Sequence, residues 1–468
     1  MNGAAPLIGE PAPAPLTPRA RWRADLRDMA RIAGPIVLIN VGLQSMGVVD
    51  TLMVGRLGGE AIAAVALGNF YFFNVCIFGL GLLCALDPVI AQAVGAGERD
   101  GVARGFQRGV VMALVVAVFA MIALMPGEPL LRALGQPEEV IGDTASYARR
   151  RAIGALPFFL FNVFRQTLQA LGPVRPILWA VGIANVVNAF ANWVLIDGNL
   201  GAPALGVPGA GWATALSMWT MAPLLAVFAW PHLRDAIRPW RVETLHLAPL
   251  GRMLRIGVPI GLQWFFESFA FGLTALFMGL LGTVSLAGHE IALNMAALTF
   301  MVPLGISGAA AAVVGRAIGR GDIAAARRDA VAAIVCGVGF MCISAIVFIS
   351  APMWLATRYT TEAETVAVAV MLIPLAGVFQ VFDGLQAVTS GVLRGTGDTR
   401  VPAVLHIVAF WGVGIPLGAW LGFQTSLRER GFWWGLVAGL AMAALLQSWR
   451  VSRRLRGDIA RVRIDLAR

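Results

Sequence analysis

Residues 35–58 read PIVLINVGLQSMGVVDTLMVGRLG, and residues 259–282 read PIGLQWFFESFAFGLTALFMGLLG. Each stretch is mostly apolar and is long enough for an α-helix to cross a bilayer, which takes about 20 residues. Each also holds one acidic residue within its apolar run, Asp50 in the first and Glu267 in the second. The two stretches therefore predict a pair of transmembrane helices, each with an acid inside the membrane.

The rest of the chain has the same character. Of the 468 residues, 58% are hydrophobic and 13% are charged, and the mean hydropathy is +0.76. Soluble domains carry about 25% charged residues, so a water-soluble fold is excluded. We expect an all-α integral membrane protein with twelve transmembrane helices. The apolar runs lie at about 32–54, 62–86, 108–126, 152–171, 177–197, 210–230, 254–281, 289–314, 329–351, 366–391, 402–422 and 432–449.

The arginines give an orientation. They gather before the first span, between the sixth and seventh spans, and after the last span. Because basic residues collect on the cytoplasmic side, both tails are expected in the cytoplasm. The expected organisation is a cytoplasmic tail (1–31), a six-helix lobe (32–230), a cytoplasmic linker (231–253), a second six-helix lobe (254–449) and a cytoplasmic tail (450–468). The net charge of +10 is spread over these loops, which argues against nucleic-acid binding.

The chain contains an internal repeat. When it is shifted by 224 residues, Pro35 falls on Pro259 and Gly81 falls on Gly305, and identical residues recur as far as Arg104 and Arg328. Each half holds six spans, so the halves repeat in parallel about an axis along the membrane normal. Parallel repeats place a binding site between them near the midplane, an arrangement typical of transporters.

Three acids lie well inside predicted spans: Asp50, Glu267 and Asp383. An ionisable side chain there costs about 2.5–3.5 kcal/mol on insertion scales, so it is expected to serve a function. The sequence offers these acids no basic partner within the spans. Each could hold a proton, bind Na⁺ or attract an organic cation. We expect the site around Asp50 to include Pro35, which should break the first helix, Gln44, and the amides Asn185, Asn188 and Asn192, which share one face of the fifth span.

Two further groups are weaker candidates. Glu290 follows His289 at the start of the eighth span, but the second histidine of a zinc-binding helix is missing. Glu290 is therefore a possible site residue, or an acid that favours a helix N-terminus. The isolated histidines, including His406, are interpreted as structural.

Seven motifs together resemble the multidrug and toxic compound extrusion (MATE) transporters, and within them the NorM-like branch. The resemblance extends over roughly residues 30–450. The motifs are VVDTLMVGRLG (48–58), AQAVGAGE (91–98), NVVNAFANWVLIDG (185–198), GVPIGLQWFFESFAF (257–271), LAGHEIALNM (286–295), GRAIGRGD (315–322) and GVLRGTGDTRVP (391–402).

The resemblance implies two six-helix lobes around a V-shaped cavity and cation-coupled export of drug-like organic cations. It assigns coupling-ion or substrate binding to Asp50, Glu267 and Asp383, with Asn188 and Asn192 beside the first. A phenylalanine, Phe379, stands one turn before Asp383, where a hydroxyl would help to ligate Na⁺. This departure favours H⁺, although Na⁺ at Asp50, or at Glu267 and Asp383, stays open.

The resulting hypothesis is a secondary antiporter of the bacterial inner membrane that exchanges organic cations for H⁺ or Na⁺. We expect no cofactor, no nucleotide and no enzymatic activity, and a monomer embedded in the lipid bilayer. A flippase for lipids or lipid-linked precursors is the alternative on the same scaffold, but it would favour arginines in the cavity. A membrane-embedded enzyme is the third possibility, and the sequence has no visible nucleophile–base or metal constellation for it.

Overall fold

The computed structural model describes residues 18–465, which form helices and no strand. The first half, or N lobe, ends with the helix that precedes the connection at residues 238–246. Its helices are α1 (Pro18–Val54), α2 (Gly59–Leu83), α3 (Leu86–Gly95), α4 (Arg99–Leu124), α5 (Gly127–Ala133), α6 (Glu138–Ala152), α7 (Ala155–Leu171), α8 (Arg175–Asp197) and α9 (Val207–Ile237).

The second half, or C lobe, repeats this order after the short 3₁₀ turn η3 (Val242–Leu245). A π-helical segment, η4, interrupts its eleventh span between α15 and α16. The helical elements are α10 (Leu247–Leu281), α11 (Thr283–Gly319), α12 (Ile323–Ser350), α13 (Pro352–Ala356), α14 (Ala363–Gly395), α15 (Arg400–Ile407), η4 (Val408–Gly414), α16 (Ile415–Gln424) and α17 (Glu429–Arg454).

The helix count agrees with the sequence. Within the described residues, eleven helical segments are long and apolar enough to cross a membrane. The remaining predicted span, the fourth at about 152–171, is α7, which has 17 residues and packs on α4 and α9. A helix of that length is at the short end of what spans a bilayer. The twelve-helix, two-lobe architecture is confirmed.

Three boundaries differ from those expected. Helix α1 begins at Pro18, so the part of the expected N-terminal tail that is described is helical; residues 1–17 and 466–468 of the two tails lie outside the described residues. The expected linker at 231–253 is largely absorbed into α9 and α10. Pro35 does not break the first span, because α1 runs continuously through it.

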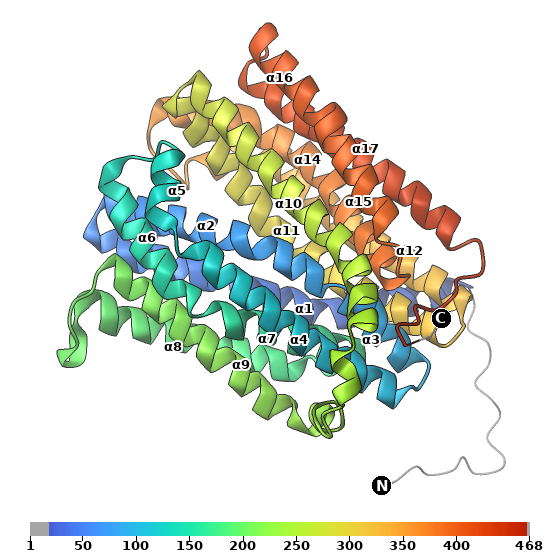
Figure 1. The fold of residues 1–468 in the computed structure, drawn as a ribbon. Helices are drawn as coiled ribbons and strands as arrows, with labels where there is room; N and C mark the ends of the chain where they lie inside the picture. Colours follow the sequence, from blue (N-terminus) through green and yellow to red (C-terminus); the bar gives the residue numbers. More distant parts are fainter. Residues whose placement is uncertain (1–17, 466–468) are drawn as a thin grey trace, which may run out of the picture.

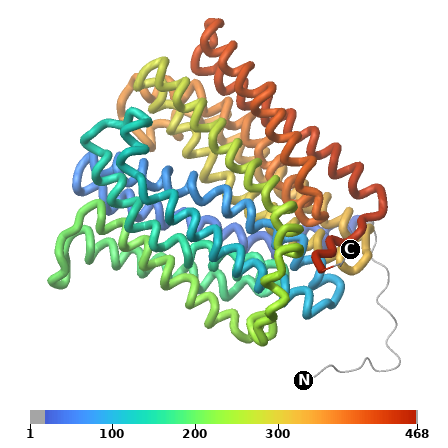
Figure 2. Tube along the Cα trace, in the orientation of Figure 1, coloured from blue at the N-terminus to red at the C-terminus, as the bar shows by residue number. Residues whose placement is uncertain are grey.

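The two lobes lie side by side and diverge (Figures 1 and 2). Both described ends of the chain lie at one end of the helices, here called the inner end, near α3 and the start of α12 (Figure 1). Helix α1 packs on α11, and α10 packs on α2, so the first helix of each lobe crosses to the other lobe. The lobes therefore form a V whose arms separate away from the inner end.

Contacts between the lobes at the inner end obey the 224-residue repeat. A Cβ at Gly81 would lie 2.5 Å from Gly261 Cα, and a Cβ at the equivalent Gly305 would lie 2.6 Å from a side-chain carbon of Val37. Ala91 and Gly315 are equivalent to each other and are in contact. A contact between two equivalent positions must lie on the pseudo-twofold axis, so this axis passes close to Ala91 and Gly315 and runs between the lobes.

The C-terminal segment joins the lobes at the same end. Ile464 is buried in the core of the N lobe, and Asp465 accepts hydrogen bonds from Arg104 at 2.7 Å and Arg108 at 2.6 Å. Burial alone would raise the pKa of Asp465, but the hydrogen bonds from Arg108 and Arg104 outweigh it, so its pKa lies below the ordinary value. The segment thus ties the end of the C lobe to α4.

Candidate functional site

Asp50 is the centre of a polar cluster inside the N lobe. Its side chain is fully buried. One carboxylate oxygen accepts hydrogen bonds from Asn192 at 2.6 Å and Asn188 at 3.0 Å. The other accepts from the hydroxyl of Thr214 at 2.5 Å. The expected pairing of Asp50 with the amides of the fifth span is therefore present, and Thr214 on α9 completes it.

Local sequence explains how this cluster is built. Asn188 and Asn192 are four residues apart, so they lie on the same face of α8 and reach one carboxylate oxygen. Thr214 is one of several hydroxyl-bearing residues in its span, and sequence reasoning missed it. The side-chain oxygen Oδ1 of Asn192 is buried without a hydrogen-bond partner among the described residues.

A basic side chain lies near this cluster, which the sequence did not predict. Arg151, at the end of α6, donates hydrogen bonds to Asn69 and to the Tyr147 hydroxyl and lies over the Phe72 ring at 4.3 Å. Arg151 is close enough for its charge to act on Asp50. Because α6 packs on α2 and α9, this arginine lies closer to Asp50 than the sequence suggested, but its hydrogen bonds go to Asn69 and Tyr147 and not to the carboxylate.

The other residues expected around Asp50 lie apart from it. Asn185 donates to the carbonyl of Gly42 and accepts from Ser45, so it joins α8 to α1 without reaching Asp50. Gln44 is exposed. Pro35 is 15 residues before Asp50, about 22 Å along a helix. Pro35 and Gln44 lie on α1, and Asn185 contacts that helix from α8. The rise and rotation of the helices place all three away from the carboxylate of Asp50.

The C lobe holds a second acidic cluster. Glu267 on α10 and Asp383 on α14 are close enough for their charges to act on each other. The Glu267 side chain is 18% exposed and Asp383 is 7% exposed. Neither side chain is as exposed as a side chain that faces lipid. Glu267 and Asp383, which the sequence named as separate candidates on the seventh and tenth spans, therefore lie in one region of the C lobe.

His406 is part of this second cluster. Its Nε2 lies 3.5 Å from Oε2 of Glu267, and its Nδ1 lies 3.1 Å from Nε2 of Gln386. The interpretation of His406 as an isolated residue is wrong: α15 packs on α10 and delivers the ring to the acid. Glu290 is exposed, and its backbone carbonyl accepts a hydrogen bond from Asn294.

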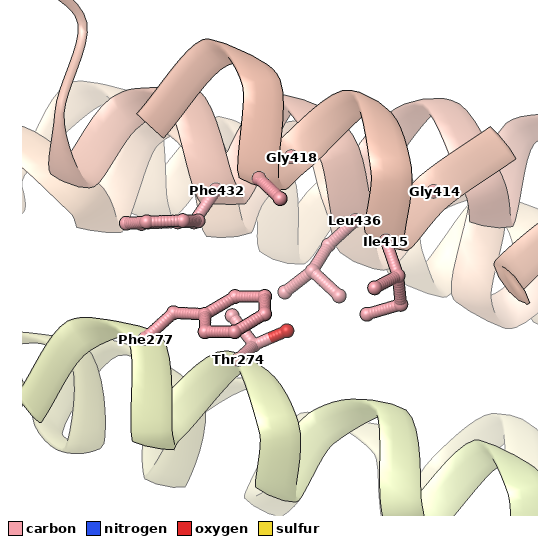
Figure 3. A pocket seen from close by; sticks show the side chains of 8 residues that line it. Thr274, Phe277, Gly414, Ile415, Gly418, Phe432 and Leu436 are labelled. Carbon is pink, nitrogen blue, oxygen red and sulfur yellow. The ribbon is translucent and has the colours of Figure 1, made fainter. Parts of the chain in front are cut away.

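The two acidic clusters are not related by the repeat. Thr274 is the counterpart of Asp50 in the C lobe, and its hydroxyl bonds to the carbonyl of Ala270 in its own helix. Thr274 borders a narrow gap lined by residues of α10, η4, α16 and α17, where Phe277 and Phe432 face each other (Figure 3). Glu267 corresponds to residue 43, seven residues before Asp50, or about 10 Å along a helix. The lobes therefore carry chemically different sites at different depths.

An ion pair closes the inner end. Arg394 on α14 lies 3.2 Å from Asp87 on α3, and the two side chains are 8% and 13% exposed. Arg394 also donates to the hydroxyl of Ser307. The two residues are 307 positions apart in the chain, so no local sequence pattern indicates this pair. This pair joins the two lobes nearer the inner end than either acidic cluster.

The donor set around the acids bears on what they could bind. Among residues 18–465, no group of three or more His, Cys, Asp or Glu side chains is placed to hold a metal ion. The groups that contact Asp50 donate N–H and O–H hydrogen bonds to it, while the side-chain oxygen of Asn192 beside them is an acceptor without a partner among the described residues.

The amino-acid sequence is similar to those of known proteins over most of its length. The MatE family model matches residues 35–194 and 259–420, two segments that begin 224 residues apart. The chain is 39% identical over 437 residues to a probable multidrug resistance protein NorM of Burkholderia mallei, covering 91% of this chain and 92% of that protein. It is 34% identical to the multidrug resistance protein PmpM of Pseudomonas aeruginosa, covering 94% of each chain.

Solved structures share the fold. The eukaryotic MATE transporter AtDTX14 superposes with a TM-score of 0.85 at 21% identity, covering 93% of this chain and 99% of that one. A multidrug resistance MATE family transporter in an outward-facing conformation gives a TM-score of 0.84 at 21% identity, covering 92% of this chain and 96% of that one.

Proposed function

Because the chain belongs to the MatE family, we propose that it is a secondary antiporter that exports organic cations in exchange for protons. The relatives that it matches over most of their length are named multidrug resistance proteins, and the chain is a multi-pass membrane protein of the same fold. The bacterial inner membrane, with both tails in the cytoplasm, is the location that the arginine distribution favours. The role proposed is transport, not enzymatic catalysis, and no cofactor takes part.

The observation that carries the proposal is the environment of Asp50. A fully buried carboxylate that accepts three hydrogen bonds is stabilised in its ionised form by donors and destabilised by the loss of water. These opposing effects allow the group to gain or lose a proton when its surroundings change. Arg151 adds a positive charge nearby, which opposes the uptake of any cation at Asp50, a proton as well as Na⁺.

The second cluster supports binding of the exported cation. Glu267 and Asp383 place two acids in one part of the C lobe, and mutual repulsion favours either a shared proton or a bound organic cation. Phe265, Phe269 and Trp411 form a stacked group on another face of α10, and aromatic faces attract organic cations. Protons and organic cations that compete for these acids would drive export, because coupling needs only a difference in affinity between inward-open and outward-open states.

The test is transport in proteoliposomes loaded with a fluorescent organic cation such as ethidium. We expect a pH gradient alone to drive exchange and a Na⁺ gradient alone to leave it near background. Asp50→Asn, Glu267→Gln and Asp383→Asn should each lower exchange at least about tenfold, the effect of losing roughly 1.4 kcal/mol of differential binding. Glu60→Gln, which removes an exposed acid at the start of α2, is the matched control.

Wild-type rates in all three acid variants would refute the assignment of the carboxylates. Exchange driven by Na⁺ alone would refute proton coupling and return Na⁺ as the coupling ion. Scrambling of a fluorescent phospholipid with no ion gradient, in the absence of ethidium exchange, would support the flippase alternative.

A further inference from the structure

His406 occupies an unusual position in the C lobe. It is fully buried in the last turn of α15, and the π-helical segment η4 begins two residues later. Phe410 from η4 stacks on its ring, with centroids 4.7 Å apart and planes 26° apart. π-Helical turns are rare and occur frequently at functional sites, because the extra residue redirects the side chains of that turn. His406 lies two residues before this segment, and its Nε2 lies 3.5 Å from Oε2 of Glu267.

The hydrogen bond from Gln386 fixes which ring nitrogen carries the proton. Nε2 of the Gln386 amide lies 3.1 Å from Nδ1 of His406. An amide nitrogen has hydrogens to donate and no acceptor, so Nδ1 must accept. The proton of a neutral imidazole is then on Nε2. Gln386 thereby orients an N–H group toward the side of the ring where Glu267 lies.

That N–H group has no hydrogen-bond partner yet. Nε2 of His406 is buried and unpartnered among the described residues, and the nearest acid oxygen, Oε2 of Glu267, is 3.5 Å away. A charge-assisted N–H···O bond is about 2.7–2.9 Å long, so a movement of less than 1 Å would form it. Trp411 in η4 donates to the carbonyl of Phe266 at 3.2 Å, which ties η4 to the turn of α10 that carries Glu267.

We propose that His406 is a positioning residue for Glu267: its Nε2–H group, oriented by Gln386, hydrogen-bonds the carboxylate when Glu267 is ionised and releases it when Glu267 takes up a proton. This inference rests on the proposed function. The histidine stays neutral and donates, so it favours the form of Glu267 that binds an organic cation. The difference in hydrogen bonding gives α10 two arrangements relative to α15 and η4, one for each protonation state.

Helix α10 contributes Glu267 itself and α14 contributes Asp383, while η4 has no titratable residue. Helix α11, which packs on α10 and α14, carries His289, whose ring packs against Trp433, and the exposed Glu290. On α17, Gln447 bonds to Thr389, and the next charged residue is Arg450, which is held by Asp398 at 2.6 Å. The pH dependence at this site is therefore expected to follow Glu267 and Asp383, with the imidazole N–H group as the modulating partner.

The experiment measures binding of ethidium to the purified full-length protein in detergent as a function of pH, with exchange in proteoliposomes in parallel. His406→Phe keeps an aromatic ring beside Phe410 but removes the donor. We expect its half-maximal binding to move about one pH unit upward, because loss of the donor destabilises the ionised carboxylate and Glu267 then keeps its proton to a higher pH. His406→Gln retains an N–H donor near the same place and should stay within about twofold of wild type. Gln386→Leu frees the tautomer and should give an intermediate shift.

The relative effects of His406→Phe and His406→Gln on binding distinguish a hydrogen-bonding role of His406 from a packing role. If His406 serves only to pack against Phe410, His406→Phe will behave as wild type and His406→Gln will be impaired, which is the reverse of the expected order. Thermal unfolding in the same detergent identifies a variant that fails to fold, and the remaining substitutions then carry the comparison. Absence of pH-driven exchange in the wild-type protein would refute the proposed function, whereas normal exchange with an unshifted His406→Phe profile would refute this inference alone.

Discussion

Breaking the ion pair between Asp87 and Arg394 should open the inner end of the transporter. The pair joins α3 of the N lobe to α14 of the C lobe, with an N–O distance of 3.2 Å and side chains that are 13% and 8% exposed. Removing one partner of a buried pair typically costs about 3–5 kcal/mol. Part of that cost disappears when the lobes separate and water reaches the remaining charge. We therefore expect Asp87→Asn or Arg394→Gln to favour the open state by about 2 kcal/mol, a change of about 30-fold in its population.

The assay uses Cys84, which is 6% exposed at the end of α2, three residues before Asp87. Cys76, Cys336 and Cys342 are first replaced by alanine, and alkylation of Cys84 by a maleimide is followed in membranes. When opening and closing are fast relative to alkylation, the rate tracks the population of the open form. Each single variant should then be alkylated about 30-fold faster than the parent.

A double-mutant cycle and a control complete this test. The variant with both substitutions should be alkylated far more slowly than the product of the two single effects predicts, since each charge matters only through the other. Asp398→Asn is the matched control, because its ion pair with Arg450 lies within the C lobe. Alkylation rates within twofold of the parent in both single variants, or strictly multiplicative effects in the double variant, would show that this pair does not hold the inner end closed.

Three further outcomes are expected. Thr214→Val should lower ethidium exchange about tenfold by removing the 2.5 Å hydrogen bond to the N-lobe carboxylate, while Thr220→Val, whose hydroxyl bonds only to its own helix, should leave exchange unchanged. Gly81→Ala should hinder closure of the inner end and accelerate Cys84 alkylation, because the new Cβ would lie 2.5 Å from the opposite backbone; Gly34→Ala has open space around it and should have no such effect. Asp465→Ala should lower the apparent Tm in detergent at pH 7. Since the pKa of Asp465 is held below its ordinary value of 3.8, its contribution is present above about pH 4 and is lost as the pH falls through the lower folded-state pKa, so the Tm difference from wild type should disappear only in that acid range.

The membrane architecture could be predicted because it depends on quantities that add along the chain. Apolar length gives the spans, and the arginine distribution gives the expected orientation. The 224-residue repeat predicted two equivalent lobes, and the contact between Ala91 and Gly315 agrees with that symmetry. The acids at positions 50, 267 and 383 were visible as candidates because an ionisable group in an apolar run is costly wherever it points.

The partners of those acids were predicted only where helical periodicity is sufficient. Asn188 and Asn192 are one turn apart, so a shared face followed directly from spacing. Spacing also suggested Asn185 and Gln44, which the rotation of the helices carries to other neighbours. Pro35 was expected to break its helix, but within a membrane the surrounding helices support a continuous α1 through a proline.

By itself, the sequence determined the number of spans, their repetition in two lobes and the depth at which the acids enter the membrane, because hydrophobic transfer is a local property of each segment. Only the tertiary structure decided which groups meet those acids. Thr214 at Asp50, Arg151 close by, His406 at Glu267 and Arg394 at Asp87 come from helices far apart in the chain. A hydrogen bond or ion pair depends on distances of a few ångströms and on orientation, and these are set by how the helices pack.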